Sequence, residues 1–367
     1  MNERRVCLLA HDAAPSSCFD ALGTSLRATY NGLKVSTAIG NGKPIVGLSD
    51  DDLKHMVQSS HFLLLGMSSS SKFAEIEIKA GEWAREAGIP YGFYSDVTYA
   101  THRATEGLWF HELAQDAQLV LGLLPKTGIS GIFPKAHCVN TGNPLREETA
   151  FQKISRAESR NRLEIRDDQI LIIAPGGKFA AGNSAIWILL LETLSRIPER
   201  EKFVVVMTPH PGDTTLRAYD RLTDKNLPIY AEICEDAPVR TLYVTRDTMT
   251  TSEVLAGADL VVEFTTSTSI EAAYQRIPVI SVMLQSWLTR FEKESGLHTV
   301  EAVGSGASIP VYGDIREFEC TILNLIDKNG HVYQNVISAQ ESAYPIPSKR
   351  GEALSMMVEE IGRFVFP

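Results

Sequence analysis

Short apolar runs alternate with amphipathic stretches along the whole chain, and this alternation restricts the possible folds more than any other feature of the sequence. The first part contains four apolar runs of strand length, at residues 5–10, 61–67, 90–94 and 118–123. Residues 73–87, between the second and third runs, repeat apolar side chains at helical spacing. Apolar strands linked by helices are typical of a parallel sheet that is covered on both faces. The sequence therefore predicts an α/β protein built on parallel sheets.

The second part of the chain repeats this pattern. Its expected strands are residues 169–174, 203–208, 240–244, 259–264 and 278–282, and its expected helices are residues 183–196, 214–222, 252–256 and 268–275. A polar stretch, residues 147–168, separates the two parts and is expected to form a linker and an exposed helix with little core. We therefore predict two Rossmann-like, doubly wound domains that face a cleft, at residues 1–148 and 149–347. Residues 348–367 are expected to form a helix that returns to the first domain.

Composition and charge exclude several classes of protein. The 367 residues are 44% hydrophobic and 22% charged, which is enough apolar material for two cores and excludes a disordered chain. The net charge of −10, without a stripe of Lys and Arg, argues against nucleic-acid binding. No apolar run approaches the roughly 18–20 residues of a membrane-spanning helix, and the first run ends at His11, too early for a signal peptide. These observations predict a soluble, cytoplasmic enzyme.

The cysteines do not suggest a disulfide framework or a zinc site. They are odd in number, widely spaced and without a C-x-x-C pair: Cys7, Cys18, Cys138, Cys234 and Cys320. Cys7 is expected in the core. Cys18 is expected in a loop, where it is the one candidate nucleophile, with an inert thiol as the alternative. We expect neither a metal site nor a cofactor.

Ligands of doubly wound sheets bind at the loops beyond the carboxyl ends of the strands. The clearest such loop follows strand 259–264, where a hydroxyl cluster leads directly into a helix: Thr266, Ser267, Thr268 and Ser269. The N–H groups of a helix start, together with hydroxyls, can hold the phosphates of a ligand. Glu271, in the same helix, can accept hydrogen bonds from two hydroxyls of a sugar. The alternative is a helix cap, with Glu271 completing a capping box.

Two further loops of the second domain are candidates for the same ligand. Strand 169–174 is followed by residues suited to a phosphate: Gly176, Gly177 and Lys178. Asn183 or Ser184 is expected to cap the next helix. His210, in TPHPGD after strand 203–208, is framed by two prolines and is a candidate ligand contact. The alternatives are an ordinary Gly-Gly turn and a structural histidine.

The first domain offers three polar loops. His11 and Asp12 follow the first strand, and a His–Asp neighbourhood is suited to general base catalysis on a hydroxyl acceptor, with a helix cap as the alternative. Asp96 follows the third expected strand and is a further candidate base. Residues 66–72, GMSSSSK, repeat the strand, hydroxyl run and helix of the second domain. They are a candidate site for a second polar ligand or a flexible Ser-rich turn.

Three stretches together resemble one superfamily. Residues 139–146, VNTGNPLR, resemble the V-T-G-N-P-[IV]-R segment of the N-acetylglucosaminyltransferase that makes the peptidoglycan lipid intermediate, and its counterparts in diacylglycerol galactosyltransferases and non-hydrolysing UDP-N-acetylglucosamine 2-epimerases. Residues 259–278 are similar to the donor-binding strand, loop and helix of these enzymes, in which a glutamate holds the ribose. His210 in TPHPGD is similar to their H-P loop. The chain thus resembles the glycosyltransferase-B (GT-B) superfamily, whose two Rossmann-like domains hold a nucleotide-sugar chiefly in the second.

The resemblance implies metal-independent transfer of a sugar from a nucleotide-sugar, with UDP among the candidate nucleotides, to an unidentified small-molecule or glycan hydroxyl. Under this hypothesis Glu271 holds the ribose, residues 176–178 and 266–269 hold the diphosphate, and His11, Asp12 or Asp96 is the base. The H-x-E-A-G-x-R run of the 2-epimerases is absent, which argues against epimerisation. The alternatives are a nucleotide-sugar hydrolase or epimerase on the same scaffold, and a GT-B-like ligand-binding protein without turnover. The sequence indicates no oligomeric state.

Overall fold

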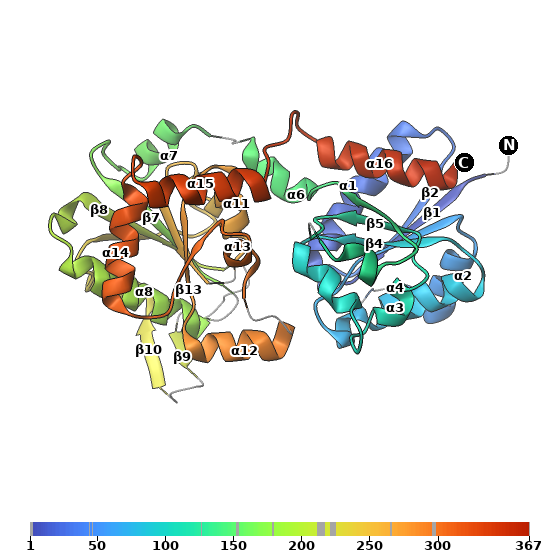
Figure 1. The fold of residues 1–367 in the computed structure, drawn as a ribbon, viewed down its shortest axis with the longest axis horizontal. Helices are drawn as coiled ribbons and strands as arrows, with labels where there is room; N and C mark the ends of the chain where they lie inside the picture. Colours follow the sequence, from blue (N-terminus) through green and yellow to red (C-terminus); the bar gives the residue numbers. More distant parts are fainter. Residues whose placement is uncertain are drawn as a thin grey trace. The chain divides into compact units, whose positions relative to one another are not determined.

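The structure is a computed structural model that describes residues 3–43, 45, 47–125, 127–151, 154–177, 180–210, 217–220, 225–264, 266–295 and 299–366. By its internal contacts the chain divides into two compact units (Figure 1). The N-terminal unit comprises Met1–Glu148 and Pro347–Pro367, and the C-terminal unit comprises Thr149–Ile346.

The N-terminal unit is built on a parallel sheet in the order β2-β1-β3-β4-β5-β6. Its strands are β1 (Arg5–Ala10), β2 (Lys34–Ile39), β3 (Phe62–Leu65), β4 (Tyr91–Ser95), β5 (Leu119–Gly122) and β6 (His137–Asn140). Its helices are α1 (Ala13–Thr29), α2 (Asp50–Gln58), α3 (Ser71–Glu86), α4 (His111–Ala114), α5 (Ile129–Ile132), α6 (Pro144–Glu147) and α16 (Glu352–Val365), with 3-10 turns at Thr98–Ala104 and Glu148–Ala150. Cys7 and Leu9 of β1 pack with α2 and α3, whereas Val6 and Leu8 pack with α1 and α16. The sheet is therefore covered on both faces.

The last helix, α16, completes the core of the N-terminal unit. It lies beside α1 in Figure 1, and its apolar side chains share one buried cluster with those of α1. Met357 and Ile361 of α16 are fully buried there together with Phe19 and Leu22 of α1. The amphipathic spacing of α16 thus serves to cover one face of a sheet whose strands lie more than 200 residues earlier in the sequence.

The C-terminal unit has a parallel sheet in the order β11-β8-β7-β12-β13-β14. Its strands are β7 (Ile170–Pro175), β8 (Phe203–Thr208), β11 (Arg240–Tyr243), β12 (Leu260–Glu263), β13 (Val279–Val282) and β14 (Ile309–Val311), with an antiparallel pair, β9 (Arg217–Asp220) and β10 (Lys225–Ile229). Its helices are α7 (Arg156–Arg162), α8 (Ala180–Arg196), α9 (Tyr230–Glu235), α10 (Thr251–Leu255), α11 (Thr268–Tyr274), α12 (Gln285–Ser295), α13 (Glu301–Gly304), α14 (Ile315–Ile326) and α15 (His331–Ala343), with a 3-10 turn at Arg200–Lys202. Ile172 packs with α8 and α14, and Ile173 packs with α10. Both units therefore confirm the predicted Rossmann-like α/β class.

Two expectations about the C-terminal unit were wrong. The helix expected at residues 214–222 is not formed where the structure describes that range, because Arg217–Asp220 is strand β9. The polar stretch at residues 147–168 does contribute to a core: Leu163 and Ile165 are buried, and the Arg160 side chain is 4% exposed beside Asp259. The polarity of a sequence segment alone does not distinguish an arginine that is buried against a carboxylate from an arginine that is exposed to solvent.

The strand orders fix where a ligand is expected in each unit. In the N-terminal unit the chain direction across the sheet reverses between β1 and β3, and in the C-terminal unit it reverses between β7 and β12. At such a switch point the connections leave the carboxyl ends of two neighbouring strands toward opposite faces, which opens a crevice for ligands.

Candidate functional site

The C-terminal unit brings the loop after β7 against the loop after β8. The Gly176 N–H donates to the Thr208 carbonyl at 2.7 Å. A Cβ on Gly176 would lie 2.9 Å from Asn183 Nδ2 and 3.1 Å from the His210 backbone nitrogen, so a side chain at this position would clash with its surroundings. The predicted residues Gly176 and His210 are therefore neighbours through their backbones. Lys178 lies outside the described residues.

Asn183 does not cap a helix, contrary to expectation, because α8 already begins at Ala180. Asn183 Oδ1 accepts from the Gly177 N–H at 2.7 Å, and Asn183 Nδ2 donates to the Gly177 carbonyl at 3.0 Å. Ser184 lies in the same helix and is fully buried. The side-chain amide of Asn183 thus holds the backbone of Gly177 in place. The position of Asn183 in the sequence does not reveal this role.

Glu263, which the sequence analysis did not single out, holds the loop after β12. It is 1% exposed, its Oε2 accepts from the Thr266 N–H at 2.6 Å, and its Oε1 accepts from the Ser281 hydroxyl at 2.8 Å. Burial raises the pKa of this carboxyl, and the hydrogen bonds from Thr266 and Ser281 oppose that rise. A Cβ on Gly177 would lie 3.4 Å from the Phe264 carbonyl and 3.6 Å from Thr266 Cγ2. The loops after β7 and β12 therefore touch at the switch point.

The start of α11 is not a capping box. Ser267 occupies the cap position without a side-chain cap bond, and the third helical position is Ile270 rather than Glu271. The Ser269 hydroxyl donates to the Thr266 carbonyl at 2.8 Å. Among the four predicted hydroxyl residues, Ser267 is exposed and Thr266 is half-buried, whereas Thr268 and Ser269 are buried. Glu271 is half-buried in α11, and the capping alternative for its carboxylate is wrong.

In the N-terminal unit a buried glutamate joins the loops after β1 and β3. Glu77 of α3 is fully buried; its Oε1 accepts from the His11 N–H at 2.9 Å and from the Ser68 hydroxyl at 2.8 Å, and its Oε2 accepts from the Ser68 N–H at 3.0 Å. Burial raises the pKa of Glu77 to about 7, although these hydrogen bonds favour the ionised form. Glu77 is spaced three residues before Ala80 on the apolar face of the predicted helix, which is the signal that could have revealed it.

Asp12 and His11 sit at the switch point but bond to different partners. The Asp12 N–H donates to the Ser68 hydroxyl at 3.2 Å, and Asp12 Oδ2 accepts from the Ser69 N–H at 2.7 Å. The His11 ring stacks on Phe73, with ring centroids 4.9 Å apart. His11 Nδ1 is buried and has no hydrogen-bond partner among the described residues. Asp12 caps no backbone N–H of α1 with its side chain, so the helix-cap alternative for Asp12 is wrong.

Asp96 lies after β4, beside the residues of the V-N-T-G-N-P-L-R stretch. Asn143 Nδ2 donates to the Asp96 carbonyl at 2.8 Å, while Asn143 Oδ1 caps α6 by accepting from the Leu145 and Arg146 N–H groups. Burial raises the pKa of the Asp96 carboxyl; the positive charges of Arg103 and Arg146 oppose the rise, and the nearby charge of Asp12 adds to it. The three predicted acid–base candidates of this unit therefore share one edge of the sheet.

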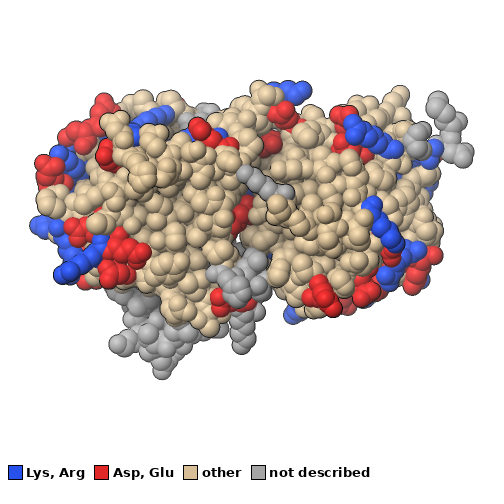
Figure 2. Space-filling model, in the orientation of Figure 1, with Lys and Arg blue, Asp and Glu red and all other residues tan. Residues whose placement is uncertain are grey.

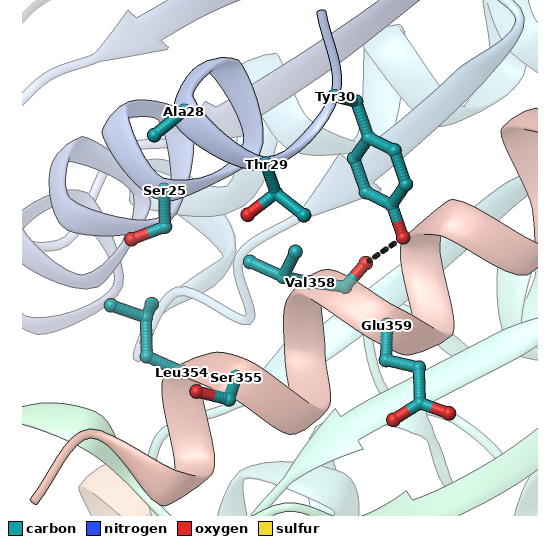
Figure 3. Close-up of a pocket in the computed structure, with 8 residues that line it drawn as sticks. All are labelled: Ser25, Ala28, Thr29, Tyr30, Leu354, Ser355, Val358 and Glu359. Atoms are coloured by element: carbon teal, nitrogen blue, oxygen red, sulfur yellow. Dashed lines mark hydrogen bonds between the residues drawn. The ribbon is translucent and has the colours of Figure 1, made fainter.

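A cavity of the N-terminal unit lies away from these three residues. About 510 Å³ in volume, it is lined by residues from the end of α1 and from α16, and the Tyr30 hydroxyl donates across it to the Val358 carbonyl at 3.5 Å (Figure 3). α1 begins beside Asp12 and runs 17 residues, about 25 Å, to this cavity. The cavity is therefore far from His11 and Asp12.

Cys18 is not a nucleophile of this site. It lies within α1 rather than in a loop, it is fully buried, and burial raises the pKa of its thiol to about 12. Within the described part of the chain, no group of three or more His, Cys, Asp or Glu side chains could hold a metal ion. No described helix is both long and apolar enough to cross a membrane. On the face drawn in Figure 2, basic and acidic side chains are interspersed in small groups.

No family model and no curated protein matches this sequence. Solved structures match it over nearly its whole length. MnaA of S. aureus, in a structure with UDP, is 11% identical with a TM-score of 0.63, over 98% of this chain and 96% of that one. The UDP-GlcNAc 2-epimerase of Neisseria meningitidis, bound to UDP-GlcNAc, is 13% identical with a TM-score of 0.61, over 98% and 100% of the two chains. The chain has the GT-B fold.

The other GT-B neighbours include a different kind of enzyme. The wall teichoic acid polymerase TagF is 12% identical with a TM-score of 0.53, over 98% of this chain and 88% of that one. UDP-GlcNAc 2-epimerase of Methanocaldococcus jannaschii is 10% identical with a TM-score of 0.53, over 98% and 99%. At these identities the comparisons establish the GT-B fold, and the chemistry has to be argued from the residues of this chain.

Proposed function

We propose that the protein is an enzyme that uses a nucleotide-sugar, with UDP as its nucleotide, and transfers the sugar to a hydroxyl acceptor. The observation that carries the proposal is the contact between the loops after β7 and β12, where Gly177 packs against Phe264 and Thr266 at the switch point of the sheet. Because Gly176 and Gly177 carry no side chains, a diphosphate can approach the strand ends closely there and reach the hydroxyls of the loop after β12. Two similar structures were solved with UDP or UDP-GlcNAc, which supports this choice of ligand.

We assign the donor to the C-terminal unit. Lys178 and the hydroxyls of the β12 loop would bind the diphosphate, and Gly176 and Gly177 would leave room for it beside the backbone. Glu271 would accept hydrogen bonds from the ribose. His210, beside Gly176, would contact the same ligand. These groups would stabilise the negative charge that develops on the departing UDP when the bond to the anomeric carbon breaks.

We assign the acceptor base to the N-terminal unit. His11 is the first candidate, because Glu77 fixes its backbone and Phe73 fixes its ring. Asp12 and Asp96 are the second and third. The base would take the proton from the acceptor hydroxyl while its oxygen attacks the anomeric carbon, so that one C–O bond forms and the bond to the diphosphate breaks. Replacing each candidate singly, with UDP affinity as the control, would identify the base.

The donor site is tested by calorimetric titration of UDP. We expect Glu271→Ala to weaken UDP binding at least tenfold, because two hydrogen bonds to a charged carboxylate are lost. Ser267→Ala is expected to weaken binding by a smaller factor. Glu192→Ala, an exposed glutamate of α8, is the matched control and is expected to bind UDP as the unmodified protein does. Unchanged UDP affinity in both Glu271→Ala and Ser267→Ala would show that the site is wrongly placed.

Epimerisation at C2 of UDP-GlcNAc is a second candidate function, favoured by the several 2-epimerases among proteins of similar fold. Incubation with UDP-GlcNAc alone, followed by proton NMR, separates the two. Formation of the 2-epimer without an acceptor would support epimerisation and contradict transfer. An intact donor that is consumed only when an acceptor is added would support transfer.

A further inference from the structure

A cluster of basic side chains surrounds one carboxylate at the edge of the C-terminal sheet opposite the candidate donor site. Asp259 precedes β12, whereas the donor loop follows it. Asp259 Oδ1 lies 2.7 Å from Arg156 Nη2 and 3.7 Å from Lys328 Nζ, and Asp259 Oδ2 lies 3.2 Å from Arg160 Nη1. Three cations therefore share one anion in a chain whose net charge is −10. The cluster keeps an excess of two positive charges.

Asp259 is fully engaged by its partners and cannot neutralise the cluster further. Besides the three cations, its Oδ2 accepts from the Leu171 N–H at 3.0 Å. Arg156 also donates to the Gly257 and Ala258 carbonyls, at 3.0 and 2.7 Å. These bonds use three of the five N–H groups of the Arg156 guanidinium, so two are left for another acceptor.

A polar cavity of about 190 Å³ lies at this cluster. Its walls include Arg156, Asp259, Lys328, Tyr333 and Arg276. The Lys328 side chain is 63% exposed, so its ammonium can move toward a ligand in the cavity. The volume suits a small anion rather than a nucleotide, because pockets for larger ligands measure about 300–1,000 Å³.

Arg276 stands at a position where the backbone favours glycine. It follows the end of α11 with φ = 57°; its N–H donates to the Ala273 carbonyl at 3.1 Å, and the Ile277 N–H donates to the Ala272 carbonyl at 2.9 Å. This is the left-handed position of a Schellman motif, which glycine occupies without strain. Arg276 Nη1 donates to the Ala273 carbonyl at 2.5 Å and to the Tyr344 carbonyl at 3.1 Å, and the negative charge of Glu341 acts on the guanidinium. A strained backbone conformation is kept where a residue has a function that offsets its cost. The strain at Arg276, on the wall of the cavity, therefore points to a role in binding a ligand.

We propose that this cavity binds a phosphate group, either inorganic phosphate or the terminal phosphate of a small metabolite. Arginine presents paired N–H groups to the oxygens of a phosphate, and a lysine adds a mobile point charge. The cavity and the donor loop lie at opposite ends of β12, which at four residues spans about 13 Å. The phosphate site is therefore separate from the proposed nucleotide site and does not depend on it.

The test is calorimetric titration of the full chain with inorganic phosphate at constant ionic strength, with chloride as the balancing anion. We expect saturable binding that weakens at least tenfold in Lys328→Glu and in Arg276→Gly. The Gly variant relieves the left-handed strain, so a loss of binding without a fall in Tm would not be an unfolding effect. Lys202→Glu reverses another half-exposed lysine of the same unit and is expected to bind phosphate as the unmodified protein does.

The outcomes are distinct. A sugar phosphate that competes with inorganic phosphate and binds more tightly would identify a metabolite as the natural ligand, and weaker binding would favour free phosphate; both support the site. Phosphate binding that is lost in Ser267→Ala and Glu271→Ala, but kept in Lys328→Glu and Arg276→Gly, would overturn the proposal in favour of the donor site. Absence of saturable phosphate binding to the unmodified chain would overturn it outright.

Discussion

Replacing Glu77 by glutamine is expected to remove part of the pH dependence of the stability of the N-terminal unit. Burial raises the pKa of Glu77 to about 7, from an ordinary value of 4.5. Because the folded-state pKa is raised, this group favours the folded state below pH 4.5, and the advantage is lost as the pH rises through 7. Glutamine resembles the protonated carboxyl and does not ionise.

The size of the effect follows from the two pKa values. Integrating proton binding between pH 5 and pH 8, the unmodified protein loses roughly 2.5 kcal/mol of folding free energy relative to Glu77→Gln. For a unit of this size that corresponds to a change of about 5–10 °C in the difference between the two Tm values. The variant is expected to gain relative stability as the pH rises.

The assay is urea unfolding of both proteins at pH 5, 6, 7 and 8, followed by far-UV circular dichroism. Glu75→Gln is the matched control, because Glu75 is exposed on the same helix and pairs only with Lys79 among the described residues. The control is expected to follow the unmodified protein within about 0.5 kcal/mol at each pH. If the difference in free energy of unfolding between Glu77→Gln and the unmodified protein does not change from pH 5 to pH 8, the raised pKa of Glu77 and the burial argument behind it are refuted.

Three further substitutions test the fold and the site. Gly176→Ala is expected to weaken UDP binding at least tenfold by calorimetry, since its Cβ would displace Asn183 or the loop after β8. Asn143→Ala is expected to cost about 2 kcal/mol in urea unfolding, because it removes the cap of α6 and the bond to the Asp96 carbonyl. Ile361→Ala, fully buried in α16, is expected to cost about 2–5 kcal/mol by the same measurement; a cost below 1 kcal/mol would contradict its place in the core.

The sequence predicted every central strand of the two six-stranded sheets but only one of their four edge strands, β11. β1 and β8 have the predicted bounds, because buried parallel strands are continuous apolar runs. β2 and β6 were missed, since edge strands of the sheet are half-exposed and carry polar residues such as Lys34 and His137. A continuous apolar run in the sequence therefore indicates a strand that is buried on both faces, and most strands that are exposed on one face lack this signal.

The sequence predicted which loops lie at the switch points of the two sheets, but it did not predict the buried side chains that hold these loops. Strand ends and switch points follow from the order of elements, so His11, Asp12 and Gly176 could be selected from the sequence. Glu263 could not, because an acid that accepts a buried backbone N–H group has the same one-letter signature as an acid in solvent. Glu77 is marked in the sequence only by its place on the apolar face of its helix, and its hydrogen bonds to the loop residues are not. Their roles depend on contacts between segments that are far apart in the sequence.

The return of α16 to the N-terminal unit has a consequence for the order in which the chain folds during synthesis. Ribosomes release the chain from its N-terminus, and most domains begin to fold as they emerge. Here the sheet of the first unit emerges early, but Met357 and Ile361, which cover one of its faces, emerge only after the whole second unit. The nascent first unit therefore waits with an uncovered apolar face beside α1, and a chain terminated before residue 352 would be an aggregation hazard.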